Sequence, residues 1–178
     1  MTLKTPAQAL AFVKKEGLVT LVPRFVEEVA GEHIRGSWWG HPKGKLIFTL
    51  AEALEASHEV VSVKLLGGKT TFVHEALWPT LLTVVLDETW RAHRSKKLSA
   101  AARSLWKKVE VSSRRGEAPA PVKELEVSLL VHGASEHTEK GRHEKRLTSW
   151  AQWAKAHKTG PAKLELKTAL LALMMPLP

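Results

Sequence analysis

The sequence contains no cysteine. Structural disulfides, zinc sites built on thiolates and cysteine nucleophiles are therefore excluded. A chain without disulfides suits a reducing compartment, so we expect a cytoplasmic protein, either free or associated with the nucleoid.

Long hydrophobic runs are also missing. Near the N-terminus, Lys14, Lys15 and Glu16 interrupt the apolar stretch that a secretory signal needs. The C-terminal run TALLALMMPLP has about half of the roughly 20 residues that cross a bilayer. We expect this run to form a terminal helix that docks on the core, and we expect no membrane partner.

Acidic residues are scarce relative to basic ones. The 178 residues carry 27 Lys and Arg against 18 Asp and Glu, a net charge of +9 with histidines neutral. Nine of the basic residues, against the single acid Glu110, lie between Arg91 and Arg115, so this stretch alone has a charge of +8. A surplus of this size favours a polyanionic partner, although a solvated helix surface is the commoner reason for one basic helix.

Apolar residues make up 44% of the chain, which is enough for a real core. The pattern predicts an α+β protein of winged-helix-like character, built from two small helix-rich subdomains that each carry a short β-hairpin. We place the boundary so that residues 1–92 form the first subdomain and residues 93–178 the second. The basic stretch His93–Lys97 is the predicted connector.

Capping residues, glycines and hydrophobic spacing predict the individual elements. In the first half we expect helices over 6–16, 24–30, 45–56 and 75–85, a strand over 18–22, and a hairpin over 60–74 that turns at Gly67-Gly68. In the second half we expect a helix over 100–111 capped by Ser99, a loop over 112–121, a helix turning into a strand over 122–131, a hairpin or wing over 133–141, and a second basic helix over 143–157.

The stretch SWWGHPKGK, residues 37–45, places two tryptophans in a turn before a predicted helix. An aromatic platform for a nucleobase is one interpretation, and a helix N-terminus that holds a phosphate with Lys43 and Lys45 is another. Packing of the tryptophans in the core is the third. Because consecutive residues point in different directions, we expect one of Trp38 and Trp39 to face inward and the other outward.

Basic residues of the second half suit phosphate contacts. Arg103 and Lys107 are four residues apart and therefore share one helix face. The complete set of candidate nucleic-acid-binding residues is Trp38, Trp39, His41, Lys43, Lys45, Lys69, Arg103, Lys107, His137, Lys140, Arg142, Lys145 and Arg146.

Neither a cofactor nor a metal is predicted. His132, His137 and His143 follow no spacing that is typical of metal ligands. The segment Gly67-Gly68-Lys69-Thr70 lacks the preceding glycine and spacer of a phosphate-binding loop, so we exclude nucleotide hydrolysis.

The order of motifs resembles a known family. The segments TPAQALAFVKKEGLVTLVP, KLLGGKTTFVHEALWP and LSAAARSLWKKV, with a Trp-rich segment between the first two and a basic hairpin after the third, are similar to winged-helix proteins related to the AlkZ/YcaQ crosslink-repair DNA glycosylases of bacteria. The similarity runs from about Thr5 to Trp153. It implies a tandem winged-helix fold and a role in DNA repair or maintenance.

The resemblance does not extend to the catalytic motif. Those glycosylases use a Gln-x-Gln or similar motif to position water, whereas the only glutamines here are Gln8 and Gln152. No catalytic residue is therefore assigned. We expect a DNA-binding protein that grips the phosphate backbone with a basic helix and a wing, with DNA preferred over RNA as the partner. A DNA glycosylase or lyase with a Trp-lined base pocket and a protein-interaction module are the alternatives.

Overall fold

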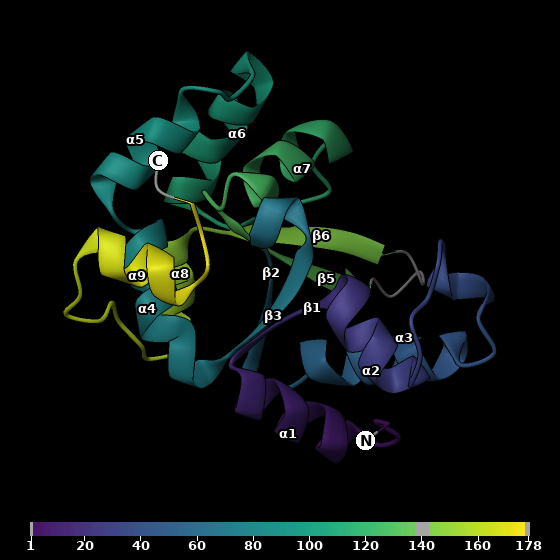
Figure 1. Cartoon of the computed structure of the whole chain (residues 1–178). Coiled ribbons are helices and arrows are strands. Elements are labelled where there is room, and N and C mark those ends of the chain that lie inside the picture. Colours follow the sequence, from purple (N-terminus) through teal and green to yellow (C-terminus); the bar gives the residue numbers. More distant parts are fainter. Residues whose placement is uncertain (1, 138–142, 177–178) are drawn as a thin grey trace. The chain divides into compact units, whose positions relative to one another are not determined.

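The computed structural model describes residues 2–137 and 143–176. Its fold is α+β, as the sequence predicted: it combines helices with two three-stranded antiparallel sheets (Figure 1). The first sheet has the strand order β1-β3-β2 and the second the order β4-β6-β5.

The chain divides into two compact units. The first contains residues 1–62 and 69–77, and the second contains residues 63–68 and 78–178. The chain passes between them within the first hairpin and again after Leu77. The boundary expected between residues 92 and 93 falls inside a helix of the second unit, because Glu88–Ser95 is helical rather than a connector.

The first unit alternates helices with short strands. Its elements are α1 (Pro6–Glu16), β1 (Leu18–Thr20), α2 (Val26–Ala30), the single turn η2 (Trp38–Gly40), α3 (Gly44–Glu55), β2 (Val60–Lys64) and β3 (Thr70–His74); the end of β2 belongs to the second unit. Thr5 caps α1 by accepting the Gln8 N–H in a capping box, and Gly17 ends the helix with a φ of 73°. Both signals were visible in the sequence.

One hydrophobic core holds the first unit together. One face each of α1, α2 and α3 packs against the inner side of the sheet to form this core. Within it, the rings of Phe25 and Phe72 meet edge to face, with their centroids 5.4 Å apart. Leu50 and Leu54 of α3 are fully buried in it, as helical spacing predicted.

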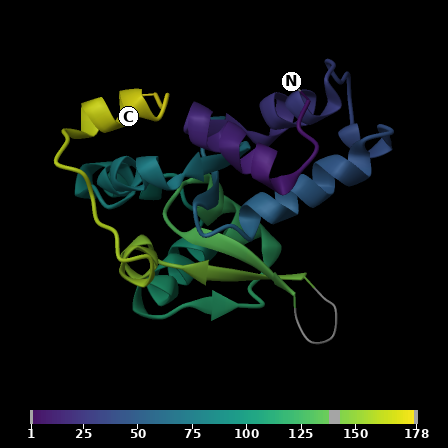
Figure 2. The same cartoon turned by 90° about the horizontal axis from the view of Figure 1, so that it is seen from below.

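The second unit follows with further helices and the second sheet. Its elements are α4 (Trp78–Val85), α5 (Glu88–Ser95), α6 (Ala100–Val111), β4 (Arg114–Arg115), α7 (Pro119–Val127), β5 (His132–His137), β6 (His143–Thr148), α8 (Trp150–Ala156) and α9 (Leu166–Ala172). Strands β5 and β6 run side by side and pair antiparallel (Figure 2). Strand β5 covers the first part of the hairpin predicted over 133–141, the rest of which lies outside the described residues. The C-terminal helix α9 buries Ala169 and Leu170, which confirms the expected docking helix.

A second core lies between α6, α7 and the second sheet. Ala102, Leu105 and Val109 of α6 pack there against Leu125 of α7 and Leu147 of β6. Ser99 caps α6 through the Ala102 N–H, as predicted.

The predicted helix over 143–157 is wrong in its first half. Residues 143–148 form strand β6, which pairs with both β4 and β5, and the helix begins only at Trp150. The apolar spacing suggested a helix that buries Leu147. Leu147 is buried in the core, but it reaches the core from the middle strand of the sheet. The predicted loop over 112–121 is also shorter, since β4 and the first turn of α7 occupy its ends.

Both units share one topology. In each, a helix leads to a short edge strand, one or two helices follow, and a hairpin then places its second strand in the middle of the sheet. Within the described ranges, no helix combines the length and the apolar character that crossing a membrane requires.

Candidate nucleic-acid interface

Trp38 and Trp39 have different environments, as predicted. Trp38 packs on the core of the first unit, whereas Trp39 is 66% exposed. Their rings stack at 4.2 Å between centroids with 21° between planes. Phe48 of α3, itself 39% exposed, lies 5.7 Å from the Trp39 ring.

The turn that carries the two tryptophans is tightly closed against the start of α3. The Gly44 N–H donates to the His41 carbonyl at 2.7 Å. A Cβ atom at Gly44 would lie only 3.0 Å from the Trp39 carbonyl oxygen, so a side chain at this position would push the turn away.

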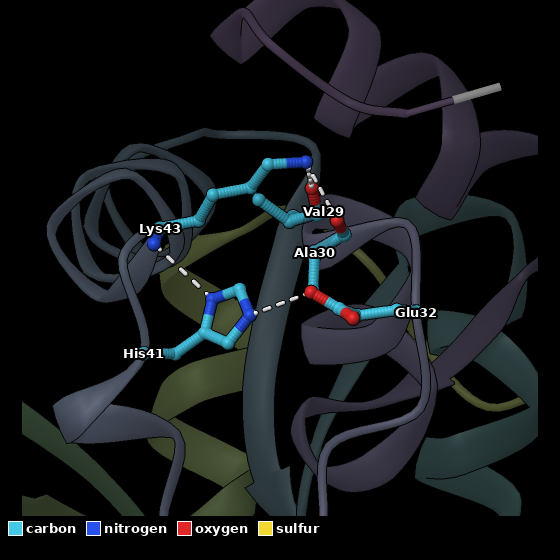
Figure 3. A network of polar contacts seen from close by, with 5 residues as sticks. All are labelled: Val29, Ala30, Glu32, His41 and Lys43. Carbon is cyan, nitrogen blue, oxygen red and sulfur yellow. Dashed lines mark hydrogen bonds and ion pairs between the residues drawn. The ribbon is translucent and has the colours of Figure 1, made fainter.

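His41 and Lys43 join this turn to the end of α2 (Figure 3). Nδ1 of His41 accepts the Lys43 N–H at 3.1 Å, which leaves the proton on Nε2 to be donated to the Glu32 carboxylate at 3.0 Å. The Lys43 ammonium donates to the carbonyl of Ala30 at 2.6 Å and reaches that of Val29 at 3.5 Å. Both predicted binding residues therefore hold the turn in place, while Lys45 is exposed.

Replacing Lys43 by Met should lower the free energy of unfolding by about 1–2 kcal/mol, because the last carbonyls of α2 lose a charged donor. Urea unfolding measures the loss. Lys45→Met, two residues further on and exposed, is the matched control and should change stability by less than about 0.5 kcal/mol. Equal losses in the two variants would contradict this role of Lys43.

A cationic face covers the outer side of α6. Arg103 and Lys107 are exposed there, on the side opposite Ala102, Leu105 and Val109. Lys108 is also exposed, and it lies about 100° around the helix from Lys107. Arg103 also donates to the Leu98 carbonyl at 3.3 Å. We call these three residues the α6 face.

Two lysines precede the helix that carries the α6 face. Lys96 and Lys97 are exposed. Across residues 2–137 and 143–176, none of the ion pairs involves Lys96, Lys97, Lys107 or Lys108. Lys96, Lys97 and Lys108 were outside the predicted set.

Other cations of the basic stretch are bound within the second unit. Arg91 pairs with Glu110 at 2.9 Å and lies over the Trp106 ring. Arg94 donates to the Val127 carbonyl at 2.8 Å, and its burial lowers the pKa of its guanidinium. These two arginines brace α5 against α6 and α7.

The hairpin cations also have acidic partners. Lys145 pairs with the buried Glu126 at 2.9 Å, and Arg146 shares Glu136 with Arg115 at 3.2 and 2.9 Å. Sequence reasoning could not supply these pairs, because they depend on the position of α7 beside the sheet and on the registers of β4, β5 and β6. Among the described residues, Lys145 therefore has a carboxylate of its own, and Arg146 has a carboxylate that it shares with Arg115.

The remaining predicted residues are Lys69, His137, Lys140 and Arg142. Lys69 is exposed at the turn of the first one. His137 is the last residue of β5, and Lys140 and Arg142 fall outside the described residues.

Three side chains of the first unit bring possible metal ligands together. Ligand atoms of Glu59, His74 and Glu75 lie within 4.8 Å of one another. However, Nδ1 of the buried His74 accepts the Ala76 N–H at 3.2 Å, so its Nε2 carries the proton. A protonated nitrogen has no lone pair for a metal, and this Nε2 faces a Glu59 oxygen at 3.8 Å. The trio fits an imidazole–carboxylate contact better than a metal site.

His132 belongs to an aromatic cluster of the second unit. Its ring lies 5.6 Å from that of Trp150 and 5.9 Å from that of Trp153, which stacks on His157. Burial, reinforced by nearby cations, lowers the pKa of His132 to about 3. The imidazole is therefore neutral at physiological pH and serves packing.

No protein-family model, curated protein or solved structure matches the chain.

Proposed function

We propose that the chain binds nucleic acid through the α6 face. One observation carries this proposal: Arg103 and Lys107 project from one exposed side of a helix whose other side is buried, the exposed Lys108 flanks them, and none of the three pairs with a carboxylate among the described residues. Cations spaced along one helix face suit successive phosphates of a strand.

The pairing of other cations supports the choice of this face. Carboxylates of the same unit form ion pairs with four other cations, Arg91, Arg115, Lys145 and Arg146. A phosphate that displaced one of these carboxylates would gain little, because an existing ion pair would be lost. The α6 face and the neighbouring Lys96 and Lys97 carry no such cost.

We propose further that both units are winged-helix modules and that duplex DNA is preferred over RNA. The shared order of helix, edge strand, helix and hairpin supports the first point. Helices and hairpins fit the wide major groove of B-form DNA, whereas the major groove of A-form RNA is too narrow for them. Lys and Arg contacts to phosphates provide affinity without sequence preference. A role in DNA repair or maintenance, in the cytoplasm or at the nucleoid, follows from the family resemblance.

The test is the salt dependence of binding to a duplex oligonucleotide, followed by fluorescence anisotropy between 50 and 200 mM salt. If three to five phosphates are neutralised, the logarithm of the association constant should fall with a slope of about −3 to −5 against the logarithm of the salt concentration. A flat dependence would contradict the proposal. The same panel includes alkylated and abasic duplexes, and release of a base or cleavage of a strand would assign an enzyme instead.

A further inference from the structure

We propose that the exposed indole of Trp39 is a stacking site for an unpaired nucleobase. This site lies in the first unit and is separate from the α6 face. The inference rests on the proposed function, which supplies nucleic acid as the class of ligand. It concerns another surface of the protein and another form of nucleic acid.

The geometry of the two indoles leaves one face of Trp39 open. Trp38 covers the other face at 4.2 Å with 21° between the planes. Because Trp39 is nevertheless 66% exposed, much of the surface that Trp38 leaves uncovered is accessible to solvent, beside the tilted Phe48 ring at 5.7 Å. A base that stacked there would extend an existing stack of two rings.

The platform is held rigidly. Trp38 packs on the core, and the Ser37 hydroxyl accepts the Trp39 N–H at 3.4 Å. The close approach of Gly44 and the contacts of His41 and Lys43 fix the same turn from the side of α3. A ring that is already in place loses little entropy when a ligand stacks on it.

The size of the aromatic surface favours a base over a protein partner. Among the described residues, the exposed aromatic rings here are those of Trp39 and Phe48, with 66% and 39% of their surfaces exposed. A whole aromatic side chain buries about 150–250 Å², whereas a stable protein interface needs about 800 Å² on each partner. One nucleobase matches an indole in area and shape.

The charge beside the platform favours a nucleic acid. Lys45 is exposed and lies three residues before Phe48 on α3, so the two side chains share one side of the helix. The N-terminus of this 12-residue helix adds positive potential at the same end. A cation next to an aromatic ring suits a base and its phosphate, and it is unusual in the apolar centre of a protein interface.

The ligand has to be an unpaired base, because neighbouring base pairs cover both faces of every base inside a duplex. Single strands, loops and flipped bases expose the face that an indole can stack on. The site therefore adds a preference for unpaired nucleotides to binding of the duplex backbone.

The experiment measures the affinity of the full chain for a 12-nucleotide thymidine single strand and for a fully paired duplex. Trp39→Ala should weaken single-strand binding about 5- to 100-fold and change duplex binding less than twofold. Trp39→Phe, which keeps an aromatic ring, should retain most of the single-strand affinity. Leu171→Ala removes another exposed apolar side chain, from α9, and should leave both affinities unchanged.

The outcomes separate this inference from the proposed function. Single-strand binding by Trp39→Ala equal to that of the wild type would overturn the stacking site, and so would parallel losses for single strand and duplex. A wild-type chain that binds duplex through the α6 face but binds no single strand would overturn the stacking site alone. A chain that binds neither nucleic acid would overturn both.

Discussion

A chain with Arg103, Lys107 and Lys108 all replaced by Gln is expected to bind duplex DNA about 100-fold more weakly than the wild type at 0.1 M salt. Each phosphate contact releases roughly 0.9 counterion from the DNA when the protein binds. Loss of three such contacts is enough to lower the affinity by about 100-fold or more at this salt concentration. Anisotropy titration at fixed salt measures the change. The three side chains are exposed and Gln is a good helix former, so the free energy of unfolding should stay nearly constant.

The control for this variant changes the same amount of charge elsewhere. Lys14 and Lys15 of α1 and Lys163, which precedes α9, are also exposed, and their triple replacement by Gln lowers the net charge by the same amount. This control should lose less than about threefold in affinity, because only the general field of the protein changes. If the two variants weaken binding equally, net charge rather than the α6 face is responsible.

The second large effect is a loss of stability in mild acid caused by His132. The unfolded chain protonates this histidine below its ordinary pKa of about 6.5, whereas the folded chain does so only near 3. Between these values the unfolded state binds more protons, so lowering the pH favours unfolding. From pH 7 to pH 5 the contribution of His132 should fall by about 2 kcal/mol.

Replacement of His132 by Leu, which has a similar size and does not titrate, should remove this part of the pH dependence. Urea unfolding of the wild type and the variant at pH 7 and pH 5 gives the difference directly, and the contributions of other groups cancel. His58→Leu, which removes an exposed histidine, should keep the wild-type dependence. If the free energy of unfolding falls equally with pH in the wild type and in His132→Leu, folding does not lower the pKa of His132.

Much of the fold could be predicted from local signals in the sequence. Thr5 with Pro6, Ser99 and the Gly67-Gly68 pair mark where elements begin or turn, and the structure confirms each of them. Both glycines adopt positive φ at the hairpin turn, a conformation that glycine adopts at little cost. These local signals were enough to predict an α+β protein with two hairpins.

The errors arose where long-range pairing overrides local pattern. Residues 143–148 carry apolar spacing compatible with a helix, yet they form the middle strand of a sheet because β4 and β5 offer hydrogen bonds on both sides. Two subdomains with a hairpin each were expected, but the strand order that the two units share depends on long-range pairing and was not predicted.

The candidate site could likewise be predicted only in part from the sequence. Helical spacing correctly placed Arg103 and Lys107 on an exposed face, and the alternation of neighbouring residues correctly separated Trp38 from Trp39. The partners of Lys43 and Lys145 come from residues 13 and 19 positions away in the chain, so the sequence could not distinguish their structural contacts from free charge. Preference for DNA and the winged-helix assignment stay predictions.

The most direct test of the α6 face is a lysine footprint. The chain is labelled with an amine-reactive reagent, with and without saturating duplex DNA, and labelling at each lysine is measured by mass spectrometry. Lys107 and Lys108 should be protected several-fold by the duplex, while Lys14 and Lys15 react at the same rate in both samples. Unchanged labelling of Lys107 and Lys108 in a chain that is fully bound to DNA would contradict the account.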